Sequence, residues 1–161
     1  MKLDEAINGV RQAESDLARR LRTVGERHAA EQDVFHLGHT LAKQCAEHVG
    51  RLAPFAERYG ARSGEIDPES SGLLESVRHK GAELLGRSTL SGSVLLHDLR
   101  GLYLAAQETE IAWVMLIQAA QAVRDADLLA AAGPCHAETE TCAKWARSRI
   151  KELAPQVYAA G

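Results

Sequence analysis

Four long stretches of the chain carry an apolar residue at every third or fourth position, and this spacing constrains the fold more than any other feature of the sequence. The spacing matches the 3.6-residue turn of an α-helix and gives each stretch one apolar face. The first stretch shows it most clearly, with Leu3, Ile7, Val10, Leu17, Leu21 and Val24. No part of the sequence alternates apolar and polar residues over a useful length, so we expect no strands.

Turn-forming residues set the expected boundaries of these helices. We expect the first helix to run from residue 3 to a turn at residues 30–33, and the second from residue 34 to residue 59. A third should cover residues 93–123, and a fourth residues 128–154 after a turn at residues 125–127. Proline disrupts helices, so Pro54 should kink the end of the second helix. Gly133 and Pro134 should bend or interrupt the fourth, whose regular part would begin near Cys135.

The segment between the second and third helices is rich in turn formers at residues 60–73, and a short helix fits residues 73–85. The chain therefore predicts two helical hairpins, residues 3–59 and 93–158, joined by a long crossover that carries a short extra helix. One long crossover is the ferritin-like arrangement of a four-helix bundle. We expect an all-α fold with a single domain over residues 1–161.

Charge and composition exclude several classes of function. The chain has 19 basic and 22 acidic residues and a net charge of -3, with the basic residues interleaved among acidic and apolar ones, so nucleic acid is not an expected partner. No apolar segment is long enough for a membrane span, and the N-terminus has no apolar signal core. Three cysteines without a CxxC spacing make a poor disulfide framework. A reducing, cytoplasmic setting is therefore expected.

A few polar residues interrupt the predicted apolar faces. Glu14, His48 and Glu110 lie on the apolar faces of the first three helices, and Glu138 flanks that of the fourth. A buried carboxylate must be paired, protonated or bound to a metal. These four residues are therefore the candidate site.

Their positions along the helices match in height. Glu14 and His48 are equally distant in sequence from residue 31, where the first hairpin is expected to turn. Glu110 and Glu140 are equally distant from residue 125, where the second is expected to turn, and Glu138 lies close to the same level. In two helical hairpins these residues should all lie near the middle of the bundle.

Three interpretations of this cluster stay open. Carboxylates and imidazole suit iron, manganese or zinc, so Glu14, His48, Glu110 and Glu138 are candidate metal ligands, with Glu140 and His136 in reserve. Alternatively, the cluster is a buried polar network that only fixes the register of the helices. A small organic ligand near Trp113 and Tyr103 is the third interpretation. No glutamate has a histidine three residues later, so a six-ligand di-iron centre is not expected.

Other candidate residues receive structural interpretations. His28 and Glu31 lie at the first hairpin turn, where we expect a surface pair or a cap. Cys45 and Cys142 are expected to be small residues of the core.

Four short stretches resemble one protein family. They are Ala13-Glu14, His48-Val49-Gly50-Arg51-Leu52, the run from Gly72 to Leu85, and Ala105-Ala106-Gln107-Glu108-Thr109-Glu110-Ile111-Ala112. Together they resemble the ferritin-like superfamily, nearest to its YciF-like branch of bacterial stress-associated proteins. The resemblance implies a four-helix bundle, a dinuclear metal site and frequent dimers. Glu14 and Glu110 match metal-site positions of that family, whereas His48 stands where it has glutamine, Gln107 where it has glutamate and Glu108 where it has histidine.

Two functional hypotheses follow. The first is a ferritin-like, metal-binding protein with a stress-related role and oxidase or peroxide-scavenging chemistry. The second is a metal-free scaffold that dimerises or binds a partner without catalysis. The apolar residues on a second face of the third helix, Leu96, Tyr103, Leu104 and Ile111, would serve a dimer.

Overall fold

The computed structural model describes residues 2–61 and 91–160, and every regular element within them is an α-helix. Helix α1 spans Leu3–Arg27, α2 spans Gln32–Arg58, α4 spans Gly92–Ala122 and α5 spans Ala126–Tyr158. The expectation of an all-α fold with four long helices is therefore confirmed. The short helix expected at residues 73–85 lies outside the described residues.

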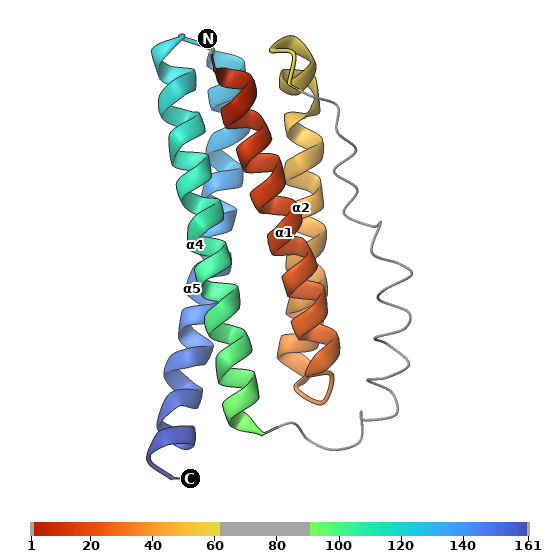
Figure 1. Cartoon of the computed structure of the whole chain (residues 1–161), viewed down its shortest axis with the longest axis vertical. Coiled ribbons are helices and arrows are strands. Elements are labelled where there is room, and N and C mark those ends of the chain that lie inside the picture. The colour runs from red at the N-terminus through yellow and green to blue at the C-terminus, as the bar shows by residue number, and fades with distance from the viewer. Residues whose placement is uncertain (1, 62–90, 161) are drawn as a thin grey trace.

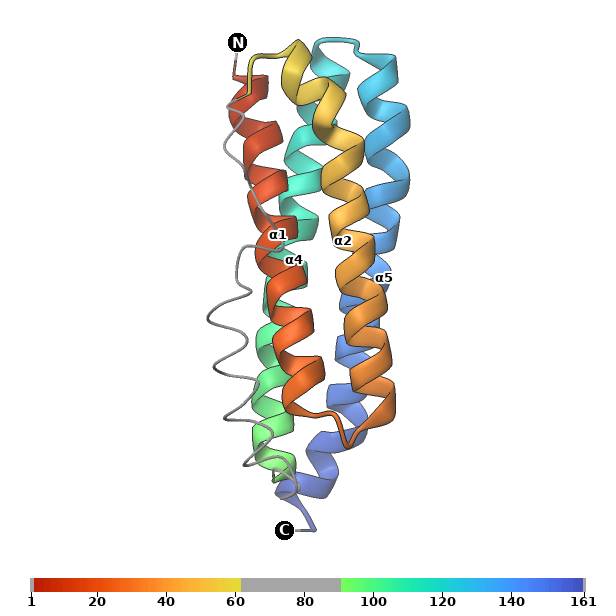
Figure 2. The ribbon, with the colours of Figure 1, turned by 90° about the vertical axis from the view of Figure 1, so that its right-hand side faces the viewer.

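The four helices lie side by side along one long axis (Figure 1). α1 and α2 form one antiparallel hairpin, and α4 and α5 form the other. Residues 61 and 91 lie at opposite ends of the bundle, so α2 and α4 run in the same direction (Figures 1 and 2). α1 packs closely against α2 and α4, and α4 packs closely against α5, whereas α2 and α5 are in looser contact.

The hydrophobic core is divided into two clusters. The cluster nearer the N-terminus of α1 contains Leu3, Ile7, Val10, Leu52, Phe55, Ala56, Ala61, Trp113, Leu116, Ala120, Leu128, Ala132 and Cys135. The other contains Leu17, Ala18, Leu21, Val24, Val34, Ala42, Cys45, Leu95, Leu99, Leu102, Ala106, Cys142 and Ala143. Ser15 of α1 and one further buried polar residue on each helix fall between the two sets; these further residues are Glu14, His48, Thr109 and Thr139. These four residues define a polar layer at the middle of the bundle.

The expected interruption of the last helix is wrong. α5 begins at Ala126 and continues through Gly133 and Pro134 to Tyr158. Its N-terminus is capped by Asp125, whose Oδ1 accepts a hydrogen bond from the backbone N–H of Leu128 at 3.0 Å. Pro134 costs the helix a hydrogen bond, roughly 3 kcal/mol in a helix interior. The first turns nevertheless stay helical, since Leu128 and Cys135 are fully buried in the core.

Two glycines allow α1 and α2 to approach closely. A Cβ atom on Gly38 would lie 2.8 Å from the carbonyl oxygen of Leu21 and 3.3 Å from the Cα of Gly25. Only a residue without a side chain fits such a contact. None of the four described helices combines the length and apolar character that a membrane span requires.

Candidate functional site

Glu14 of α1 is the centre of a hydrogen-bonded network that reaches all four helices. Its Oε1 accepts a hydrogen bond from Trp113 Nε1 of α4 at 2.7 Å and one from Thr139 Oγ1 of α5 at 3.2 Å. The same oxygen lies 2.8 Å from Nδ1 of His48 on α2. The carboxylate is completely buried. One oxygen atom therefore joins the four helices at the level of the polar layer.

His48 connects this carboxylate to a second one. Its Nε2 lies 2.7 Å from Oε2 of Glu138 on α5, and only 2% of the His48 side chain is exposed. Burial alone would lower the pKa of His48, but the hydrogen bonds and negative charges of Glu14 and Glu138 outweigh it and raise the pKa above the ordinary 6.5. A neutral imidazole has one N–H, whereas the imidazolium form donates to both carboxylates.

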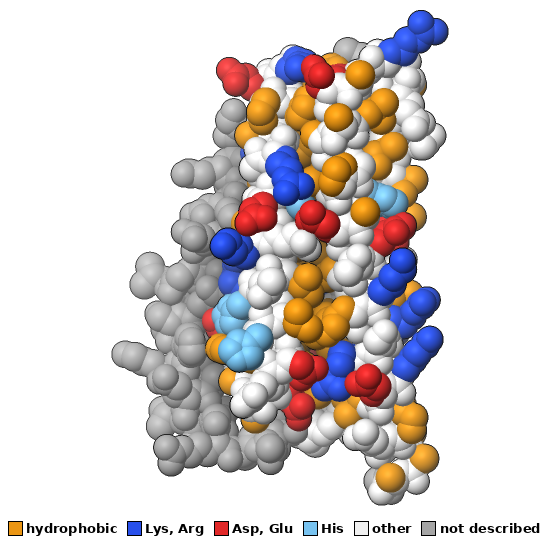
Figure 3. Space-filling model, turned by 180° about the vertical axis from the view of Figure 1, so that it is seen from behind, with side chains coloured by type: hydrophobic (Ala, Val, Ile, Leu, Met, Phe, Trp, Pro, Cys, Tyr) orange, Lys and Arg blue, Asp and Glu red, His pale blue; other side chains and the backbone are white. Residues whose placement is uncertain are grey.

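The network runs from the protein surface to the core. The Glu138 side chain is 35% exposed, and Arg51 NH1 lies 4.0 Å from its Oε1. Acidic and basic side chains lie next to each other at the middle of the face seen in Figure 3. When His48 is protonated, its charge is therefore balanced by one fully buried carboxylate and one that is partly in contact with water.

The nearby cysteines do not add a thiolate to the core. Burial and then the charge of Glu14 raise the pKa of Cys45 well above its ordinary value. The same two causes raise the pKa of Cys142 to about 12. Thiolates are the reactive and metal-binding form of cysteine, so both residues act as small apolar groups at neutral pH.

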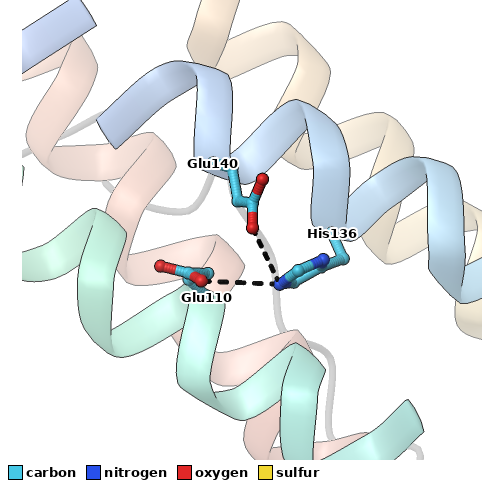
Figure 4. Close-up of side chains that lie close together, drawn as sticks. All are labelled: Glu110, His136 and Glu140. Carbon is cyan, nitrogen blue, oxygen red and sulfur yellow. Dashed lines mark ion pairs between the residues drawn. The ribbon is translucent and has the colours of Figure 1, made fainter. Parts of the chain in front are cut away.

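A second cluster lies between α4 and α5 (Figure 4). His136 Nε2 lies 3.5 Å from Oε1 of Glu110 and 3.7 Å from Oε1 of Glu140. All three side chains are partly buried, with exposed fractions of 21% for Glu110, 23% for His136 and 39% for Glu140. The Nε2 atom itself is buried and has no hydrogen-bond partner among the described residues. A single ligand atom from each residue lies within 4.8 Å of the other two.

The structure thus places the four predicted site residues in two separate clusters. Glu14, His48 and Glu138 come together in the polar layer. Glu110 instead faces His136 and Glu140. Metal ligation by the predicted set stays a prediction. The polar layer offers few free donor atoms to the dinuclear centre that the family resemblance implies: both nitrogens of His48 contact carboxylates and Oε1 of Glu14 accepts two further hydrogen bonds, while Oε2 of Glu14 is buried without a hydrogen-bond partner among the described residues.

Sequence reasoning missed two members of the network. Trp113 and Thr139 fall on predicted apolar faces, and nothing in that pattern marks them as partners of Glu14. One signal was available: a buried indole N–H usually needs an acceptor. Trp113 lies only one helical turn from Glu110, near the level of the predicted site.

Comparison of the chain with protein-family models, with curated proteins and with solved structures gave no match.

Proposed function

We propose that the chain is a ferritin-like bundle that serves as a self-associating scaffold, with an ion-paired network in the position of a metal centre. Two antiparallel hairpins whose second and third long helices run in the same direction support the ferritin-like assignment (Figure 1). It follows the second hypothesis drawn from the sequence, a scaffold without catalysis, and places no metal in the polar layer.

The contacts of His48 are the observation that carries the proposal. Its two nitrogens lie 2.8 and 2.7 Å from carboxylate oxygens, distances typical of charge-assisted hydrogen bonds. A metal ligand needs a nitrogen lone pair, and the doubly protonated ring has none. The same contacts join α2 to α1 and α5, so the network stabilises one register of the helices.

The outward face of α4 supports self-association. Of the face expected from the sequence, Leu104 and Ile111 are 52% and 54% exposed, whereas Leu96 is buried in the core and Tyr103 is half-buried. Met115 is 61% exposed and joins them, although α4 already buries another apolar face in the core. Their spacings of seven and four residues place them on one side of the helix. A helix that is apolar on both faces is normally covered on both, and a symmetric dimer presents the same face of two copies to each other.

Light scattering during size-exclusion chromatography tests this assignment. We expect the native chain to be a dimer and the double variant Ile111→Asp/Met115→Asp to be a monomer with unchanged helix content by circular dichroism. The control variant Tyr158→Ser removes a side chain that is 81% exposed but lies outside this stripe, so it should remain dimeric. A native chain that stays monomeric at every concentration tested would overturn the proposed self-association.

A further inference from the structure

We infer that Glu110, His136 and Glu140 form a binding site for a divalent first-row transition ion such as Zn²⁺ where α4 packs against α5. This site is separate from the polar layer and goes beyond the proposed scaffold function. Its geometry, its burial and its donor atoms support the inference independently (Figure 4).

The two distances from His136 Nε2 to the carboxylate oxygens are close to those between ligands around an ion. His136 Nε2 lies 3.5 and 3.7 Å from the two carboxylate oxygens, too far for good charge-assisted hydrogen bonds. Ligands at about 2.1 Å from a tetrahedral metal lie about 3.4 Å from one another. His48 in the polar layer has the same kind of partners but lies 2.7 and 2.8 Å from them. The two clusters therefore have different geometries, and only the contacts of His136 approach the spacing of metal ligands.

The helices hold these donors in place. His136 and Glu140 are four residues apart on α5, so they lie on the same face one turn apart. Glu110 reaches them from α4, which packs closely against α5 along the hairpin. A site assembled from two packed helices needs little rearrangement to bind an ion.

The imidazole nitrogen of His136 has two ion-pair contacts, at 3.5 and 3.7 Å, but no hydrogen bond within the described part of the chain. Nε2 of His136 is buried without a hydrogen-bond partner among the described residues, which is costly for a polar atom. It faces the space between the two carboxylates (Figure 4), where a cation would satisfy all three groups. One imidazole and two carboxylates suit zinc, iron or manganese better than magnesium or calcium, which prefer oxygen ligands alone.

Three protein ligands leave part of the coordination shell open. Glu140 is 39% exposed, so solvent reaches the ion from one side. Water or a small anionic molecule would complete the shell, as in zinc sites that keep an open position. Binding requires neutral His136 and ionised carboxylates, so it should release a proton whenever His136 starts out protonated.

Zn²⁺ titration of the full chain by calorimetry under reducing conditions tests the site. We expect about one equivalent to bind to the native chain. The variants Glu110→Gln, His136→Gln and Glu140→Gln should each weaken binding by about 100-fold or more, because even changes beyond the direct ligands cost roughly 10–100-fold. Co²⁺ should give the visible absorption bands of tetrahedral coordination in the native chain and not in His136→Gln.

Two controls separate this site from the rest of the molecule. Glu108→Gln removes a carboxylate from the same helix outside the cluster, and Glu14→Gln alters the polar layer; both should bind Zn²⁺ like the native chain. The inference is overturned if the native chain binds no Zn²⁺, or if Glu14→Gln abolishes binding while His136→Gln preserves it. Chromatographic tests of self-association are independent of either result.

Discussion

Replacing Glu14 by alanine is expected to destabilise the folded protein by about 3–5 kcal/mol, the cost of removing one partner from a buried ion pair. The substitution leaves the His48 imidazolium with Glu138 alone and removes the acceptor of Trp113 Nε1. It also opens a cavity between the two core clusters, because Glu14 is completely buried. Urea unfolding followed by circular dichroism measures the change in the free energy of unfolding.

Two further variants show whether the network is the cause. Glu5→Ala removes a carboxylate from the same helix whose side chain is 65% exposed, and should change stability by less than about 1 kcal/mol. The double variant Glu14→Leu/His48→Leu should cost less than the sum of its single changes, because it leaves no buried charge without its partner. Additive single effects would contradict an energetic link between Glu14 and His48.

Replacing Gly38 by alanine is expected to destabilise the bundle by about 1–3 kcal/mol through overpacking. The new methyl group would lie 2.8 Å from the carbonyl oxygen of Leu21, and this neighbour is backbone that cannot rotate away. α1 and α2 would have to separate, which loosens both core clusters. The midpoint of urea unfolding gives the size of the effect.

Gly50 provides the matched control on the same helix. A Cβ atom there meets nothing within 4 Å, so Gly50→Ala should stabilise α2 by up to about 1 kcal/mol through helix propensity. The two glycine-to-alanine changes in α2 should therefore have opposite signs. A loss of stability in both would indicate that α2 does not pack on α1 as described.

The level of the polar layer was predictable from the sequence. Equal sequence distances from the first hairpin turn place Glu14 and His48 at one height, and the 2.8 Å between Glu14 Oε1 and His48 Nδ1 confirms it. The prediction of a common height succeeded because a helix rises by a constant distance per residue. The turn therefore fixes the relative height of residues on two antiparallel helices. The apolar spacing that predicted four helices rests on equally regular geometry.

The direction of Glu110 was not predictable in the same way. α4 carries apolar residues on its outward face as well as on its inward one, so the pattern does not fix how the helix is rotated about its axis. Glu110 faces His136 of α5, while Trp113, three residues later, faces the core. This rotation depends on packing against α1 and α5, which a single sequence does not specify.

A long-range contact explains why His28, at the first hairpin turn, differs from its expected surface position. The expected surface pair between His28 and Glu31 is wrong, whereas the alternative of a cap is confirmed, because His28 is the C-cap residue of α1 and Glu31 the N-cap residue of α2. His28 is only 5% exposed, and its Nε2 lies 2.7 Å from Oδ2 of Asp98 on α4. Asp98 is distant in sequence, so no local pattern around the hairpin indicates the contact.

Nitrogen NMR of the histidine side chains, recorded across neutral pH with and without one equivalent of Zn²⁺, tests the central claim most directly. We expect His48 to carry protons on both ring nitrogens above pH 6.5, the ordinary pKa of histidine. Its nitrogen shifts should not change when Zn²⁺ is added. His136 should shift when Zn²⁺ is added. A metal-induced shift of His48, with loss of a ring proton, would place the ion in the polar layer and contradict the proposed ion pair of His48 with Glu14 and Glu138.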